Sequence, residues 1–263
     1  MKKILLVAGA LGLALITAPM FAAFEAHVVN VTATIENALS VPVDPLTFGT
    51  VFPQEHLDKT LTVTYSQSFM DQNRVDNVSY FIRQKPKCAW SWQDDNKVWN
   101  IDEGSTQTGH VTLAPTTDDP DAYFVDCGQP DKPANVPDDA TWGQLPSLCE
   151  YISKHADTDV VNDESLNSFH QSFTVSSGKI NWTDTDGLLD RSAGDTLDTW
   201  TIDLAVPCFG GYCAQDWADF VHLVSEDESI DPNLYTQPIE NEHKVFGCDL
   251  WVEVDGVTDD NVI

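Results

Sequence analysis

One acidic stretch has residue types and spacing that could bind a metal ion. The segment Asp184-Thr-Asp-Gly-Leu-Leu-Asp190 resembles a calcium loop, with carboxylates separated by one and three residues and a glycine for a sharp turn. The candidate ligands are Asp184, Asp186 and Asp190. Trp182 and Ala193 occupy the positions that would be the first and twelfth of an EF-hand loop, so the match is partial. We favour a solvated Asp-Gly turn, and calcium stays the one cofactor that the sequence suggests.

The cysteines form a second candidate group, suited to disulfides or to zinc. They are Cys88, Cys127, Cys149, Cys208, Cys213 and Cys248. Two glycines lie between Cys208 and Cys213, so the backbone can turn sharply and bring the two sulfurs together. Structural zinc sites usually need two clusters of paired cysteines, and only one such cluster exists. We therefore predict a Cys208–Cys213 disulfide, while the pairing of the other four cysteines stays open.

Aromatic and histidine side chains give weaker chemical signals. Trp90 and Trp92 share one face if they lie on a strand, where exposed indoles could stack on sugar rings. For Trp200 and Trp251 the strand patterns favour core packing. None of the seven histidines lies four residues from another, and the chain has no His-Glu-x-x-His or Gly-x-Ser-x-Gly motif. We therefore expect no enzyme.

The charge balance limits the partners. The chain has 42 acidic and 13 basic residues, for a formal net charge of -29. Nucleic acids and anionic lipid head groups would be repelled. The acidic surface favours solubility, with bound calcium and adaptation to high salt as alternatives.

The amino terminus indicates export. Lys2 and Lys3 precede an apolar run, Ile4 to Phe24, which ends in small residues. This order is typical of a secretory signal peptide, which we place at residues 1–23 with cleavage near Ala23. An uncleaved anchor is the alternative, and it would be the only membrane contact. The mature protein, residues 24–263, is expected to be secreted or held at the cell surface.

The mature chain is expected to be one all-β domain. Val29, Val31, Ala33 and Ile35 alternate with polar residues, as in a half-buried strand. Further strand patterns occur at 46–52, 61–65, 78–83, 122–127, 172–176, 179–182, 198–206 and 248–256. Residues 88–155 contain long acidic loops, and short helices are expected at 145–155 and 215–224. The pattern predicts an antiparallel β-sandwich with one or two short helices.

Three segments together resemble the TasA/camelysin family of exported proteins. They are the leader Ala8-Gly-Ala-Leu-Gly-Leu-Ala-Leu15 with Phe21-Ala-Ala-Phe24, the element Leu46-Thr-Phe-Gly-Thr-Val-Phe-Pro-Gln-Glu55 and the closing Leu250-Trp-Val-Glu-Val254. The resemblance implies a jelly-roll β-sandwich in extracellular matrix fibres, in which the N-terminal strand of one subunit completes the sheet of the next. The six cysteines and the acidic loops depart from that pattern.

The resemblance implies that the N-terminal strand, within residues 24–40, is a donor. Phe24 to Leu39 would leave its own sandwich, and Val29, Val31, Ala33 and Ile35 would fill the core groove of a neighbour. The expected function is a structural subunit of a fibre, biofilm matrix or surface layer, with copies of itself as partner and matrix polysaccharide as a further one. The alternative is a monomeric surface module that binds carbohydrate through Trp90 and Trp92 or calcium through Asp184–Asp190. A metallopeptidase ranks last, because no metal motif supports it.

Overall fold

The computed structural model describes residues 34–42, 44–72, 75–102, 106–115, 118–157 and 163–258. The chain divides into Met1–Ile35 and a compact unit, Glu36–Ile263, which holds nearly all of the described residues. The expected signal peptide, residues 1–23, and most of the expected first strand lie outside the described ranges and stay predictions. Among the described helices, none has the length and apolar character needed to cross a membrane.

Short and long strands dominate the described residues. The strands are β1 (Leu39–Ser40), β2 (His56–Tyr65), β3 (Asn77–Gln93), β4 (Trp99–Ile101), β5 (Gln107–Thr108), β6 (His110–Leu113), β7 (Tyr123–Asp126), β8 (Thr141–Gln144), β9 (Ile152–His155), β10 (Phe173–Ser176), β11 (Lys179–Trp182), β12 (Asp184–Asp190), β13 (Leu197–Ala205) and β14 (Cys248–Thr258). The helices are α2 (Gln67–Met70) and α3 (Trp217–Ser225), with 3-10 turns η3 (Cys149–Tyr151), η4 (Pro232–Tyr235) and η5 (Ile239–Asn241).

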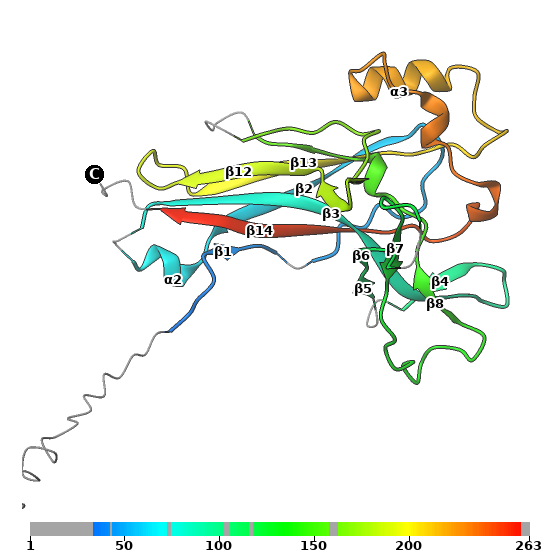
Figure 1. Cartoon of the computed structure of the whole chain (residues 1–263), viewed down its shortest axis with the longest axis horizontal. Coiled ribbons are helices and arrows are strands. Elements are labelled where there is room, and N and C mark those ends of the chain that lie inside the picture. The colour runs from blue at the N-terminus through cyan, green and yellow to red at the C-terminus, as the bar shows by residue number, and fades with distance from the viewer. Residues whose placement is uncertain are drawn as a thin grey trace, which may run out of the picture. The chain divides into compact units, whose positions relative to one another are not determined.

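Two antiparallel sheets form the body of the compact unit. One, the β2 sheet, has the order β1-β2-β13-β9, and the other, the β3 sheet, has the order β12-β3-β14. Figure 1 shows β2 and β13 in one layer and β3 and β14 in the other, with α3 above one end. The predicted all-β class with antiparallel sheets is confirmed.

The core lies between these two sheets because each contributes one apolar face. Alternate residues of β2, β13 and β3 are buried, while the residues between them are more exposed. The inward side chains are Leu61, Val63, Tyr65, Trp200, Ile202, Leu204, Val78, Tyr80 and Ile82. Burying one such side chain contributes about 1.5–3 kcal/mol. The alternation in the sequence therefore fixes which face of each strand turns inward.

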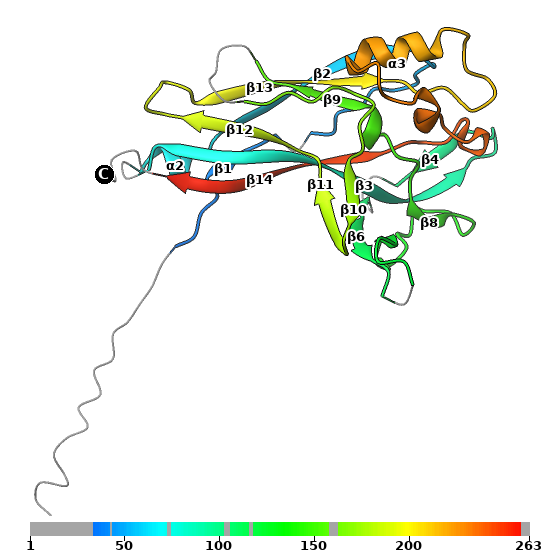
Figure 2. The same ribbon diagram turned by 45° about the horizontal axis from the view of Figure 1, so that its top comes forward.

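The region predicted as a loop-rich insertion, residues 88–155, contains a further small sheet. The second half of the 17-residue strand β3 pairs with β4, β5 and β8. Beside it, β6 pairs with β7, and β10 pairs with β11 to form a separate hairpin, visible in Figure 2. One long strand therefore belongs to both the core sheet and the small sheet.

Two of the predicted elements are wrong, and two others are confirmed. Residues 46–52 form no strand; Leu46, Phe48 and Val51 pack on the core from an irregular segment in which Gly49 has φ of +76°. Residues 145–155 form η3 and β9 instead of a helix, because β9 pairs with β13. The short strand near residue 122 is present as β7, and α3 matches the helix predicted at 215–224.

Three disulfides link all six cysteines. The predicted Cys208–Cys213 bridge is present. The other two are Cys88–Cys127 and Cys149–Cys248, and no cysteine is free. Disulfides persist in oxidising compartments, so the three bridges indicate an oxidising environment.

The Cys149–Cys248 bridge is expected to contribute the most stability, because it closes the longest loop, with a sequence separation of 99 against 5 for Cys208–Cys213. Loop-closure entropy gives about 4.7 kcal/mol for a loop of that length and about 2 kcal/mol for the shortest. Replacing Cys149 and Cys248 by alanine should therefore lower the free energy of unfolding by more than twice as much as replacing Cys208 and Cys213. Urea denaturation followed by Trp fluorescence measures both losses, and equal losses would contradict the entropic explanation.

Candidate functional site

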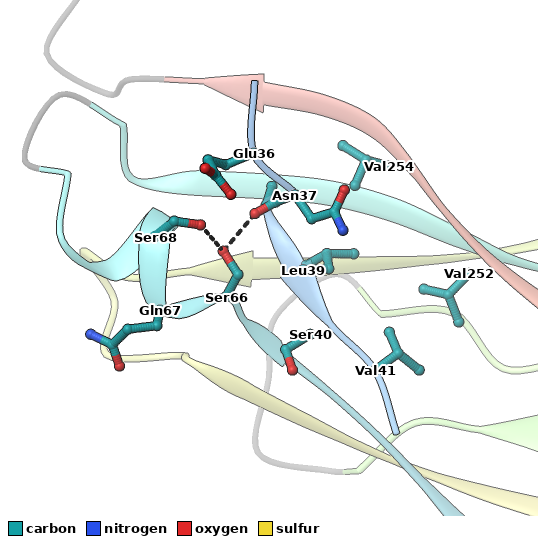
Figure 3. A pocket seen from close by; sticks show the side chains of 11 residues that line it. Glu36, Asn37, Leu39, Ser40, Val41, Ser66, Gln67, Ser68, Val252 and Val254 are labelled. Atoms are coloured by element: carbon teal, nitrogen blue, oxygen red, sulfur yellow. Dashed lines mark hydrogen bonds between the residues drawn. The ribbon is translucent and has the colours of Figure 1, made fainter. Parts of the chain in front are cut away.

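An open groove lies between one edge of the β2 sheet and one edge of the β3 sheet. Its volume is about 650 Å³. It is lined by Glu36, Asn37, Ala38, Leu39, Ser40, Val41, Ser66, Gln67, Ser68, Val252 and Val254. These residues come from the β1 segment, the start of α2 and the strand β14, as Figure 3 shows. The two sheets therefore stay apart along this side of the sandwich.

The groove has a polar side and an apolar side: six of its lining residues are polar or charged, and the other five are apolar. Leu39 and Val41 from the β1 segment lie across from Val252 and Val254 of β14 (Figure 3). Leu39, Val41 and Val252 also pack against the hydrophobic core. Val254 is 45% exposed. The groove thus offers one apolar strip, continuous with the core, beside polar side chains from Glu36, Asn37 and the start of α2.

The strand β14 leaves one backbone edge open beside this groove. β14 has eleven residues and pairs with β3 on one side. No other described strand pairs with its second side. A strand of this length spans about 36 Å. An edge of that kind carries unpaired N–H and C=O groups that can bind another strand.

The chain is attached to its own domain from Asn37 onward. Leu39 and Ser40 pair with β2, and the Ser66 N–H donates to the Ala38 carbonyl at 2.8 Å. The Ser66 hydroxyl donates to the Asn37 carbonyl at 2.5 Å and also accepts the Phe69 N–H at 3.1 Å, which caps α2. This short stretch therefore forms one wall of the groove.

These contacts shorten the predicted donor segment. The sequence placed its end at Leu39 or shortly after, but Leu39 belongs to β1 of its own chain. A segment free to pair elsewhere must therefore end by Ile35, which is described and 94% exposed. The other three predicted donor residues, Val29, Val31 and Ala33, lie outside the described ranges.

The predicted calcium loop is not a loop. Asp184, Asp186 and Asp190 lie on strand β12. Asp184 and Asp190 are six residues apart, about 20 Å in an extended strand, so the three carboxylates cannot share one ion. Asp184 instead accepts two hydrogen bonds from Arg83, at 2.7 and 2.9 Å. Among the described residues, no three His, Cys, Asp or Glu side chains stand ready-made in metal-binding geometry.

The predicted sugar-binding indoles lie on the second half of β3. Trp90 and Trp92 are two residues apart on this strand, and both are partly buried. Trp90 packs against Trp142 on β8, with ring centroids 5.6 Å apart. The structure brings neither indole close to the groove residues.

A buried polar network lies deep in the sandwich. The Lys154 Nζ donates to the Ile82 carbonyl at 3.1 Å and to Gln84 Oε1 at 3.0 Å. His170 Nε2 lies 2.8 Å from the same Gln84 oxygen. Lys154 and Gln84 are each 0% exposed, so a substrate could not reach them in this structure.

Burial changes the protonation of this network. It lowers the pKa of Lys154 to about 7, and the charge of Asp184 opposes that shift. It also lowers the pKa of His170 to about 4, with the positive charge of Lys154 adding to the effect. Both changes follow from the cost of placing a charge in a low-dielectric interior.

The sequence did not predict the groove, because the residues that line it come from both ends of the chain. Ala38 to Val41 and Val252 to Val254 are more than 200 residues apart in sequence. Among these residues, the one pattern visible in the sequence is the alternation of apolar residues in β14.

Comparison of the chain with protein-family models, with curated proteins and with solved structures found no match. The site must therefore be interpreted from its own geometry.

The buried Lys154 predicts a rise of stability with pH. Between pH 8.5 and 9.5 the unfolded lysine binds a proton that the folded lysine has released, so stability increases, by up to about 1.4 kcal/mol per pH unit. Lys154→Met should remove this slope, while Lys179→Met, at an exposed lysine, should retain it. Urea denaturation at the two pH values measures the slope; an unchanged slope in Lys154→Met would refute the assignment.

Proposed function

We propose that this chain is an exported structural subunit that assembles into an extracellular fibre or surface layer by strand exchange. The N-terminal segment of one copy occupies the groove between β1 and β14 of the next copy. The observation that carries this proposal is the open groove with an apolar strip beside β14, whose second edge pairs with no other described strand. The two packed sheets support a jelly-roll-like sandwich as the fold of the subunit.

The dimensions of the donor suit those of the acceptor. Residues 24–35 number twelve and extend to about 40 Å as a strand, against about 36 Å for β14. Val29, Val31, Ala33 and Ile35 alternate along it. One face of the donor can therefore pack on the apolar strip of the groove, while its backbone pairs with the free edge of β14.

Exchange of this kind makes filaments because the donor and the acceptor are different surfaces. Each subunit gives its segment to one neighbour and receives a segment from another. A head-to-tail contact of this type stays open unless its rotation closes a ring. The leader at the amino terminus and the three disulfides support an extracellular setting for the assembly.

Two kinds of variant test the proposal. Removing residues 24–35 from the mature chain should abolish filaments, because the donor is missing. Val254→Asp should also abolish them, because it places a charge in the groove that the donor must fill. Electron microscopy at matched concentration and salt, on chains whose folding is checked by circular dichroism, gives the result.

Val257→Asp is the matched control. Val257 lies on the same strand and is 44% exposed, against 45% for Val254, but it does not line the groove. Filaments from the Val257→Asp chain together with dispersed folded particles from the other two variants would support strand exchange. Filaments that persist after removal of residues 24–35, or dispersed particles from the unaltered mature chain, would refute it.

A further inference from the structure

Asp198 is an acidic residue inside the contact between the two sheets. It lies near the start of β13, in the β2 sheet, and is only 1% exposed. The Tyr80 hydroxyl, on β3 of the other sheet, donates to its Oδ2. The residue opposite Asp198 on β2 is Val63, which is buried and apolar. The carboxyl group of Asp198 therefore joins the two sheets from a position almost closed to solvent.

The hydrogen bonds around this carboxyl group come from neutral side chains. Trp200 Nε1 donates to the Tyr80 hydroxyl at 2.8 Å, and the one hydroxyl proton of Tyr80 goes to Asp198 Oδ2. Asp198 Oδ1 is buried and has no hydrogen-bond partner. An ionised Asp198 would therefore have one neutral donor for two buried oxygens, which is costly. A proton on Oδ1 removes the charge and most of that cost.

The charged side chains that act on Asp198 are all acidic. They are Asp163 before β12, Asp195 before β13 and Asp157 after β9. Burial raises the pKa of Asp198 to about 8; the charges of these three aspartates add to the rise, and the hydrogen bond from Tyr80 opposes it. The surroundings therefore favour the neutral form of Asp198 from several sides.

No basic side chain forms an ion pair with Asp198 in the described part of the chain. Arg191, in the turn between β12 and β13, pairs with Asp76 at 3.0 Å. The other described ion pairs also join basic side chains to carboxylates other than Asp198. A buried carboxyl group with no cation beside it is more stable as the neutral acid.

We propose that Asp198 is a pH-sensitive switch in the contact between the two sheets. Near neutral pH the folded chain holds Asp198 as a neutral carboxylic acid, and the hydrogen bonds from Trp200 to Tyr80 and from Tyr80 to Asp198 join the β2 sheet to the β3 sheet. In mild alkali Asp198 loses its proton. Because water stabilises the new charge, this end of the sandwich then opens locally near the start of β13.

The direction of the pH dependence follows from the difference between the folded and the unfolded chain. An unfolded aspartate loses its proton near about pH 4, whereas the pKa of Asp198 in the folded chain is about 8. Between these values the folded chain binds a proton that the unfolded chain has lost. Asp198 therefore makes stability fall as the pH rises, by up to about tenfold in the folding equilibrium constant per pH unit.

Asp198→Asn tests the switch, because the amide has the shape of the acid, retains an acceptor for Tyr80 and cannot ionise. Lys154 and His170 also titrate, but they contribute equally to both chains. From about pH 5.5 to about pH 7.5, the folding equilibrium constant of the unaltered chain should fall at least roughly twentyfold relative to that of the variant. Urea denaturation measures this ratio. Asp58→Asn, at an exposed position on β2, is the control and should retain the pH dependence of the unaltered chain.

Two measurements on the unaltered full chain follow the switch directly. The carboxyl carbon of Asp198 in a ¹³C-labelled chain should titrate by NMR with a midpoint near pH 8. Hydrogen exchange of backbone amides at the start of β13 should become faster above that midpoint, beyond the ordinary increase of exchange with pH. Asp198→Asn should lose this extra acceleration, whereas Asp58→Asn should retain it.

Three outcomes would overturn the proposal. The carboxyl carbon of Asp198 could already be that of an ionised acid at about pH 6.5, or the stability of Asp198→Asn could depend on pH as that of Asp58→Asn does. The third is hydrogen exchange at the start of β13 that shows no extra acceleration in the unaltered chain. If Asp198→Asn does not fold, the two measurements on the unaltered chain decide. None of these outcomes depends on filament assembly, so the test is independent of the proposed function.

Discussion

The contact between Trp200 and Tyr80 at the centre of the core constrains much of the remaining structure. These two rings lie on opposite sheets, are 0% and 1% exposed, and meet edge to face at 6.3 Å. Burying them stabilises the sandwich, but it also buries an indole N–H and a phenol hydroxyl, and both must be paired. Trp200 donates to Tyr80, and Tyr80 donates to Asp198. The apolar core thereby requires a carboxylate in its interior.

The Tyr80 ring and the Asp198 carboxylate each have a further structural consequence. Gly187 must remain a glycine, because a Cβ there would lie 2.4 Å from the Tyr80 ring. Burial raises the pKa of Asp198 to about 8, and the nearby charges of Asp163, Asp195 and Asp157 add to that rise.

The sequence predicted those parts of the fold that local pattern determines. The alternation in β2 and β13 identified the inward residues, and the two glycines between Cys208 and Cys213 identified their disulfide. Residues 145–155 misled the prediction, because apolar residues at helical spacing also fit a 3-10 turn followed by a strand, and pairing with β13 decides between them. Leu46 to Phe52 has a strand-like sequence but packs as an irregular segment.

The candidate sites depend on tertiary contacts that no local pattern carries. The groove joins residues from both ends of the chain, and the hydrogen bond from Tyr80 on β3 to Asp198 on β13 crosses the two sheets. In a chain with 42 acidic residues, paired carboxylates occur almost everywhere, so spacing alone cannot identify the functional ones. Burial separates the few carboxylates in the core, such as Asp198, from the rest, and burial requires coordinates.

The net charge of the molecule affects where two subunits could come into contact. Subunits with a net charge of -29 repel one another, and at physiological salt this repulsion is screened beyond about 8 Å but not in direct contact. Close approach is therefore least costly where both surfaces carry little charge. Of the residues that line the groove, only Glu36 is charged. Residues 24–35 contain one acidic residue, Glu25. In the proposed assembly, contact between residues 24–35 and the groove would therefore bring little charge together.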